Sequence, residues 1–274
     1  MRRWSVVVGF VLILIGVLAI LQVALTALGI AFRIWWVFWP LILIAAGLWL
    51  ISRFSWRGGN RVAHEHASIP LEGAKEASVT VRHGAGRLLI GGGLAGSNDL
   101  LLAGVFGGGL DALHRREGDR LVVDMRVKDR DISHYVFPWT RGWAGLLDWD
   151  FTLTKTIPLT LRLETGASES RLSLTDLQVR ELSVKTGASS TTVDLPASAG
   201  FTRVLVESGA AAVRLRVPDG VSASIQVRSA LAGIHVDRSR FPQTGSGYMS
   251  PDYDRAGNKV EILVETGVGS VDIF

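Results

Sequence analysis

The residues that could do chemistry in this 274-residue chain form three small groups, and the first is a glycine motif. Gly91, Gly93 and Gly96 have the G-x-G-x-x-G spacing that holds a dinucleotide pyrophosphate at the start of a helix. That motif needs a helix beginning at its third glycine, and the sequence GVFGGG at 104–109 interrupts any helix there. We therefore interpret these glycines as a flexible connection.

Two serines and a histidine pair complete the set. Ser168 and Ser189 each follow a glycine by two positions, as in a nucleophile elbow, but neither has the second glycine that an elbow requires. Both occur at the same point of a repeated segment, so they are better explained as turn residues. His64 and His66 flank Glu65, but no third metal ligand is recognisable. The sequence predicts no catalytic, metal or cofactor site, and we expect a non-enzymatic protein.

The elements that would carry a function begin with a membrane segment. The first 61 residues contain no Asp, Glu or Lys, and uncharged runs cover 4–32 and 34–51. A helix crosses the hydrocarbon core with about 20 apolar residues, so the two runs predict a transmembrane helical hairpin over residues 1–52. The alternatives are a cleaved signal peptide for the first run, whose apolar core would be shorter, and a buried globular helix for the second.

Arginine placement orients this hairpin. One arginine lies in the loop, and five lie at its outer ends: Arg2, Arg3, Arg53, Arg57 and Arg61. Positive residues favour the cytoplasmic side, so we expect a multi-pass protein of the cell membrane with both termini and the following domain in the cytoplasm. The last three arginines belong to a basic juxtamembrane linker, residues 53–68, and are expected to meet lipid headgroups. The rest of the chain has 23 basic and 25 acidic residues, which argues against nucleic-acid binding.

A repeat fills most of the remaining chain. Six segments align on a small residue, with apolar residues five and three places before it and at alternate places after it. The centres are Gly84, Gly166, Gly187, Gly209, Ala230 and Gly267. Alternation on both sides of a glycine predicts two short strands joined at a corner, where a positive φ would absorb a one-residue shift. We expect a β-repeat domain over 69–274, with insertions at 91–158 and 237–259.

A charged residue lies two places before each centre, and its sign alternates along the chain. These residues are Arg82, Glu164, Lys185, Glu207, Arg228 and Glu265. Parallel coils about 4.8 Å apart would set each charge between two of opposite sign, so that Glu207 would lie beside Arg228. The alternation favours a repeat-built β-solenoid, whereas an antiparallel β-sandwich would make it accidental. An aromatic segment, 135–149, either covers one end of the β core, as we expect, or lies at the membrane interface.

The chain resembles a known group of bacterial membrane proteins. The segment WWVFWPLILIAAGLWLI is similar to the hairpin of LiaI- and LiaF-type proteins, and the repeats with PDG, SPDY and a final GVGSVDI resemble toast-rack domains. The resemblance implies a toast-rack β domain and a non-enzymatic regulator or sensor accessory of the cell-envelope stress response, in which such proteins restrain a sensor kinase. The expected partners are the lipid bilayer and a sensor kinase or other membrane protein. A passive membrane-anchored scaffold or homo-oligomer is the alternative.

Overall fold

The computed structural model describes residues 64–94, 99–128 and 147–274, and these form only strands, turns and loops. No helix in these ranges is long and apolar enough to cross a membrane. The hairpin expected at 1–52 lies outside the described residues. So do Arg53, Arg57 and Arg61 and most of the aromatic segment.

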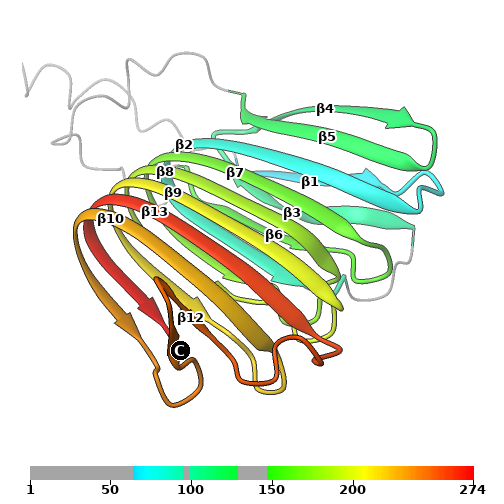
Figure 1. The fold of residues 1–274 in the computed structure, drawn as a ribbon. Helices are drawn as coiled ribbons and strands as arrows, with labels where there is room; N and C mark the ends of the chain where they lie inside the picture. Colours follow the sequence, from blue (N-terminus) through cyan, green and yellow to red (C-terminus); the bar gives the residue numbers. More distant parts are fainter. Residues whose placement is uncertain (1–63, 95–98, 129–146) are drawn as a thin grey trace, which may run out of the picture. The chain divides into compact units, whose positions relative to one another are not determined.

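Six long strands form the centre of the domain, and each bends near its middle into an arch (Figure 1). They are β2 (Glu76–Gly92), β7 (Leu159–Ser173), β8 (Val179–Asp194), β9 (Phe201–Arg216), β10 (Ser222–Val236) and β13 (Lys259–Ile273). Neighbouring arches pair in parallel and in register along nearly their whole length. The predicted parallel stack is therefore confirmed for these strands, and the antiparallel sandwich is not formed by them.

Shorter strands complete a 13-stranded mixed sheet at both ends of the stack. They are β1 (His64–Pro70), β3 (Leu100–Gly107), β4 (Leu110–Glu117), β5 (Arg120–Val127), β6 (Trp149–Leu153), β11 (Gln243–Thr244) and β12 (Gly247–Met249). The first leg of β2 pairs with β5, and its second leg pairs with β6, so the sheet branches there. Two boundaries of the sequence analysis shift as a result. The sheet already includes residues 64–68, which were expected to be linker, and the insertion 91–158 contains four of its strands.

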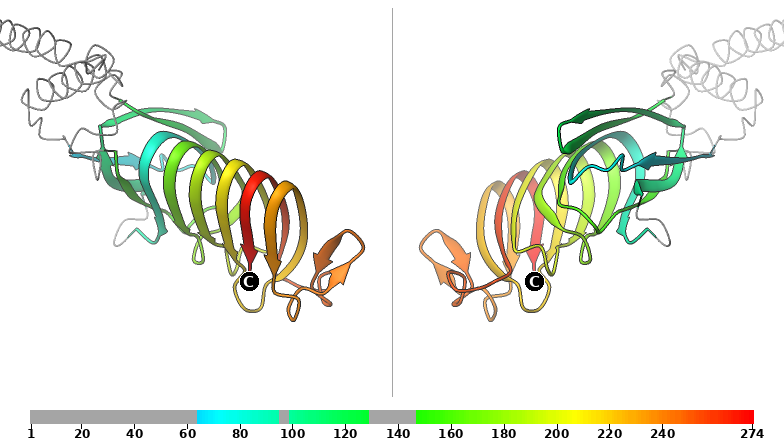
Figure 2. Two further views of the ribbon diagram at one scale, coloured as in Figure 1. Left: turned by 90° about the vertical axis from the view of Figure 1, so that its left-hand side faces the viewer. Right: turned by 90° about the vertical axis from the view of Figure 1, so that its right-hand side faces the viewer.

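The arches are not stacked in chain order, which corrects one expectation. The last strand, β13, lies between β9 and β10, as both views of Figure 2 show. The segment 237–258 is long enough to carry the chain back past β10 to this inner position. Both legs of β13 bury a full row of apolar side chains, whereas the crest and second leg of β10 are largely exposed. β13, which buries apolar side chains on both legs, therefore lies inside the stack with an arch on either side, and β10 lies at its end.

The space between the two legs of each arch is the hydrophobic core. The apolar residues five and three places before the six centres are twelve in number and were expected to point inward; eleven of them are buried, and Val227 on β10 is only partly so. The buried residues are Val79, Val81, Leu161, Leu163, Leu182, Val184, Val204, Val206, Ile225, Ile262 and Val264. Period-two alternation thus identified the inner face, because successive side chains of a strand point to opposite faces.

The corner glycines serve a different purpose from the predicted one. None of them has a positive φ; positive values occur two residues later at Gly86 and Gly269. A Cβ on Gly267 would lie 2.6 Å from the carbonyl oxygen of Gly209, and one on Gly187 would lie 3.0 Å from that of Gly166. Neighbouring arches approach so closely at the corner that a side chain has no room there. Close approach, rather than a special backbone conformation, therefore explains four of the corner glycines, Gly166, Gly187, Gly209 and Gly267, whereas an added Cβ on Gly84 would meet nothing within 4 Å.

Candidate functional site

The six charged residues before the corners form one row along the outer surface of the arches. Arg82 Nε lies 3.0 Å from Glu164 Oε2, and Lys185 Nζ lies 3.0 Å from Glu207 Oε2. Glu164 and Lys185 are direct neighbours in the register of β7 and β8. The neighbouring Glu207 and Glu164 carboxylates raise the pKa of Lys185 above its ordinary value, with Glu207, its hydrogen-bond partner, having the larger effect. The first four members of the row therefore alternate in sign as predicted.

The alternation breaks where β13 enters the stack. Glu265 lies directly opposite Glu207 in the register of β13 and β9, so two carboxylates are neighbours. Arg228 lies beside Glu265, with 2.8 Å between Nη1 and Oε1, and is separated from Glu207 by one strand. The expected Glu207–Arg228 pair is therefore wrong. Like charges in directly opposite positions destabilise a sheet, so this pair departs from the rule that the rest of the row follows.

A shallow groove of about 700 Å³ lies at this break. It is lined by Lys185, Glu207, Glu265 and Arg228, and by Ser208 and Thr266, which follow the two glutamates. The hydroxyl groups of Ser208 and Thr266 are buried and make no hydrogen bond within the described residues. Buried hydroxyls are usually satisfied, and the exceptions mark sites with a further partner or role. We name this surface the acidic groove.

The missing hydrogen bonds have an explanation in the sequence. On β8 the Thr186 hydroxyl donates to Ser189 at 2.6 Å, three residues further along the same arch. The residues equivalent to Ser189 are Ala211 on β9 and Gly269 on β13, which offer no hydroxyl. Ser189 is therefore part of a buried hydroxyl network. The repeat unit loses this acceptor in the two arches that hold the acidic pair.

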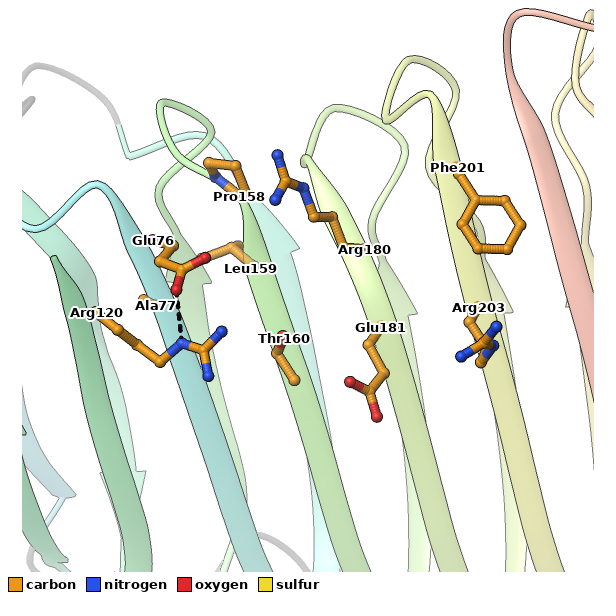
Figure 3. Close-up of a pocket in the computed structure, with 10 residues that line it drawn as sticks. All are labelled: Glu76, Ala77, Arg120, Pro158, Leu159, Thr160, Arg180, Glu181, Phe201 and Arg203. Atoms are coloured by element: carbon orange, nitrogen blue, oxygen red, sulfur yellow. Dashed lines mark hydrogen bonds and ion pairs between the residues drawn. The ribbon is translucent and has the colours of Figure 1, made fainter. Parts of the chain in front are cut away.

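A second hollow, of about 240 Å³, lies at the start of the arches (Figure 3). Arg120, Arg180 and Arg203 line it together with Glu76 and Glu181. Arg120 already binds Glu76 at 2.8 Å, and Arg203 lies 3.3 Å from Glu261 on β13. Arg180 follows the irregularity in the β7–β8 register and has no ion pair within the described residues. One free guanidinium is a weak anion site, so the acidic groove is the better candidate.

Neither hollow brings catalytic groups together. Ser168 lies inside the arches, where its hydroxyl shares a 3.3 Å hydrogen bond with that of Ser170. His64 and His66 lie on β1, and no group of three metal-binding side chains occurs in the part of the chain that the structure describes. At the acidic groove each of the two adjacent carboxylates is paired with one cation of the row, and the contact between the carboxylates themselves is left uncompensated.

His83 is a buried titratable group that the sequence analysis left unassigned. It occupies the position that holds Thr or Ser in the other repeats, and it is 1% exposed. Its Nε2 donates to the Leu147 carbonyl at 2.7 Å, its ring lies 5.2 Å from that of Trp149, and Nδ1 has no partner within the described residues. Burial lowers the pKa of His83 below 6.5, against the opposing effects of the Leu147 carbonyl and the Asp148 carboxylate.

This geometry predicts an acid-sensitive fold. A proton on Nδ1 would place an unpaired charge in the core, so the unfolded chain binds it more readily than the folded one. The stability that neutral His83 confers is complete above pH 6.5 and is lost as the pH falls below it, by at most about 1.4 kcal/mol per pH unit. Melting of the full chain between pH 7.5 and 5 measures the loss. His83→Gln should lose less stability over the same range; equal losses would contradict the assignment.

Comparisons with known proteins agree with the arch architecture. The model of the N-terminal domain of toast-rack (DUF2154) matches residues 57–216, more than half of the chain. The crystal structure of a candidate cell adhesion protein from Clostridium sporogenes has a TM-score of 0.67 and 19% identity, covering 78% of this chain and 99% of that one. A candidate adhesin from Bacteroides fragilis covers 79% and 98% at 9% identity, with a TM-score of 0.28 that is too low to support the fold. No curated protein matches in sequence.

Proposed function

The chain belongs to the toast-rack family, and from this premise we propose that it is a membrane-anchored, non-enzymatic regulator that binds a protein partner through its acidic groove. The proposed anchor is the LiaI/LiaF-like hairpin of residues 1–52, and the proposed location of the domain is the cytoplasm. The proposed partner is a sensor kinase of the bacterial cell-envelope stress response, or another membrane protein, that presents a basic side chain to the groove.

The neighbouring carboxylates of Glu207 and Glu265 carry this proposal. In the rest of the row each inner charge lies between two charges of opposite sign, whereas Glu207 and Glu265 each have one opposite neighbour, Lys185 or Arg228, and one like neighbour. At the groove two carboxylates lie in directly opposite positions of neighbouring strands, where a further cation would be favourable. Departures from local rules tend to coincide with functional sites. A Lys or Arg of a partner, bound between the carboxylates, would remove the repulsion.

The fold is compatible with a binding role. The arches present long rows of exposed side chains at fixed spacing, which suits recognition of a protein surface better than enclosure of a small substrate. The similar Clostridium sporogenes structure is described as a candidate cell adhesion protein, which also implies binding. A passive scaffold would have the same arches but would not need the acidic pair.

Photocross-linking in native membranes tests the proposal. A photoreactive amino acid at Lys185, on the wall of the groove and separated from β10 by two strands, should capture one defined partner. The double variant Glu207→Gln with Glu265→Gln should lower the yield about tenfold, since hydrogen bonds between charged groups contribute about 1.5–3 kcal/mol each. The matched control is Glu164→Gln, a glutamate of the same row that binds Arg82 outside the groove.

Three results would count against the proposal. Equal capture by wild type and the double variant would assign the groove no role, and an equal loss in the Glu164 control would indicate general electrostatics. A reporter fused after Phe274 tests the location. Activity only of a reporter that works outside the membrane would contradict the cytoplasmic placement and, with it, the kinase.

A further inference from the structure

The outer edge of β10 is an unfinished end of the sheet. One side of the strand pairs with β13 over nearly its whole length, but the other side pairs with β12 only at Ser224 and Ile225. Within the part of the chain that the structure describes, the backbone from 226 to 236 therefore has a free edge. Proline and charged side chains discourage pairing with another strand, and this segment contains no proline and, apart from Arg228, neither Lys, Asp nor Glu.

The core is also open along this edge. Val227 and Ile234 occupy the same rows as Val264 and Val271 of β13, which are fully buried. Ile234 is nevertheless 41% exposed, because no arch among the described residues covers the outer side of β10. Leu231 near the corner is 78% exposed, but so in large part is its neighbour Val268 inside the stack, at 53%. Apolar residues that a further arch would bury thus lie along the free edge.

We infer that this edge pairs with the same edge of a second copy of the chain, forming a two-fold dimer in which the two stacks join end to end. A half-turn about an axis through the crest of β10 exchanges the two legs of the arch. It therefore places the first leg of one copy antiparallel to the second leg of the other. The core would then be continuous across the interface.

The sequence of β10 is complementary to itself in this arrangement. With the axis between Ala230 and Leu231, Val227 lies opposite Ile234 of the second copy, and both side chains face the core. On the outer face Gln226 lies opposite His235, and Arg228 lies opposite Gly233, so no two arginines meet. An axis through Ala230 itself would instead set Val227 against Gly233, an inward position against an outward one. Of these two registers, only the first keeps apolar residues together.

A head-to-tail stack is excluded by the other end of the sheet. There the two legs of β2 pair with different strands, β5 and β6, and the outermost strands are β4 and β1. Among the strands that the structure describes, no single arch is available at that end to receive β10. The contact must therefore join like ends, which closes after two copies.

The test uses the full chain in detergent. The chain has no cysteine, so introduced thiols are unique. When Gln226→Cys and His235→Cys chains are mixed and oxidised, they should form covalent dimers, because the two positions face each other across the axis. The control mixture of Gln226→Cys with Arg228→Cys should not, because these positions lie on opposite ends of the paired strands. A parallel pairing would reverse the two results and overturn the proposal.

A second measurement separates this contact from association through any other part of the chain. The wild-type mass should be about twice that of one 29.6 kDa chain. Ile234→Lys should raise the dimer dissociation constant about a hundredfold or more and leave the fold intact, because each dimer would bury two unpaired ammonium groups. Phe201→Lys, at an equally exposed residue away from the edge, should remain dimeric. A wild-type monomer would overturn the proposal, as would an Ile234→Lys dimer without the 226–235 cross-link.

Discussion

Alanine at Gly166 is expected to cost about 3 kcal/mol of folding stability, whereas alanine at Gly84 should cost almost nothing. The new Cβ at Gly166 would lie within 3.0 Å of the Gly84 carbonyl oxygen, which belongs to the backbone of a paired strand and cannot move alone. Overpacking a well-packed site costs about 1–3 kcal/mol or more. The expected decrease in the melting temperature is about 6–12 °C for a domain of this size.

Gly84 is the matched control because it has the same place in the repeat but no neighbouring arch on the side of its missing side chain. An added Cβ there meets no atom within 4 Å, and its φ is not positive. Thermal melting of the full chain, followed by the β-sheet signal in circular dichroism, compares the two variants. Equal melting temperatures for Gly84→Ala and Gly166→Ala would contradict the close approach of the arches.

Trp149→Ala is expected to destabilise the domain by about 3–5 kcal/mol, the usual cost of removing a large buried aromatic side chain. Trp149 is fully buried, packs edge to face against Phe106 at 5.1 Å, and donates from Nε1 to the Gly107 carbonyl at 3.0 Å. Trp149→Phe keeps most of the packing but leaves that carbonyl without its donor. Its expected cost is therefore lower, about 1–3 kcal/mol.

Urea unfolding of the three proteins measures this order of stability. Trp149 is the last residue of the aromatic segment 135–149, so the result also distinguishes, at this residue, a cover of the β core from a contact with the membrane interface. Replacing a tryptophan at the membrane interface by alanine would change the urea midpoint little. Replacing a tryptophan in the core would lower it. An unchanged urea midpoint for Trp149→Ala would therefore contradict the role of this residue in closing the end of the β core.

The arches could be predicted from the sequence because their information is local and repeated. Alternation at positions such as Val79 and Leu161 identifies the inner face without any knowledge of neighbours. β1 was missed because His64, Glu65 and His66 present no apolar alternation, and its place depends on pairing with β3. The purpose of the corner glycines was also misjudged, because a missing side chain does not reveal whether the backbone needs rotation or space.

To predict the order of the arches from the sequence, charged residues outside the row from Arg82 to Glu265 had to be considered as well. The alternating signs of the row from Arg82 to Glu265 fit arches stacked in chain order, and in that order β10 would lie beside β9. Two other positions argue against it: Arg203 binds Glu261 at 3.3 Å, and Arg214 binds Asp272 at 3.7 Å, both on β13. With β10 in that place, Arg203 would face Ser224 and Arg214 would face His235. The acidic groove depends on the insertion of β13, so it could not be predicted before that order was known.

The position of β13 has a consequence for how the protein is made. Synthesis proceeds from the N-terminus, so β9 and β10 leave the ribosome before the strand that must separate them exists. If these two strands pair early, they form a nonnative contact that has to open when β13 arrives, and unpaired edges are prone to association while they wait. A nonsense mutation before Lys259 would therefore remove an interior slice of the sheet. Such a truncated product should be degraded or aggregate rather than persist as a shortened domain.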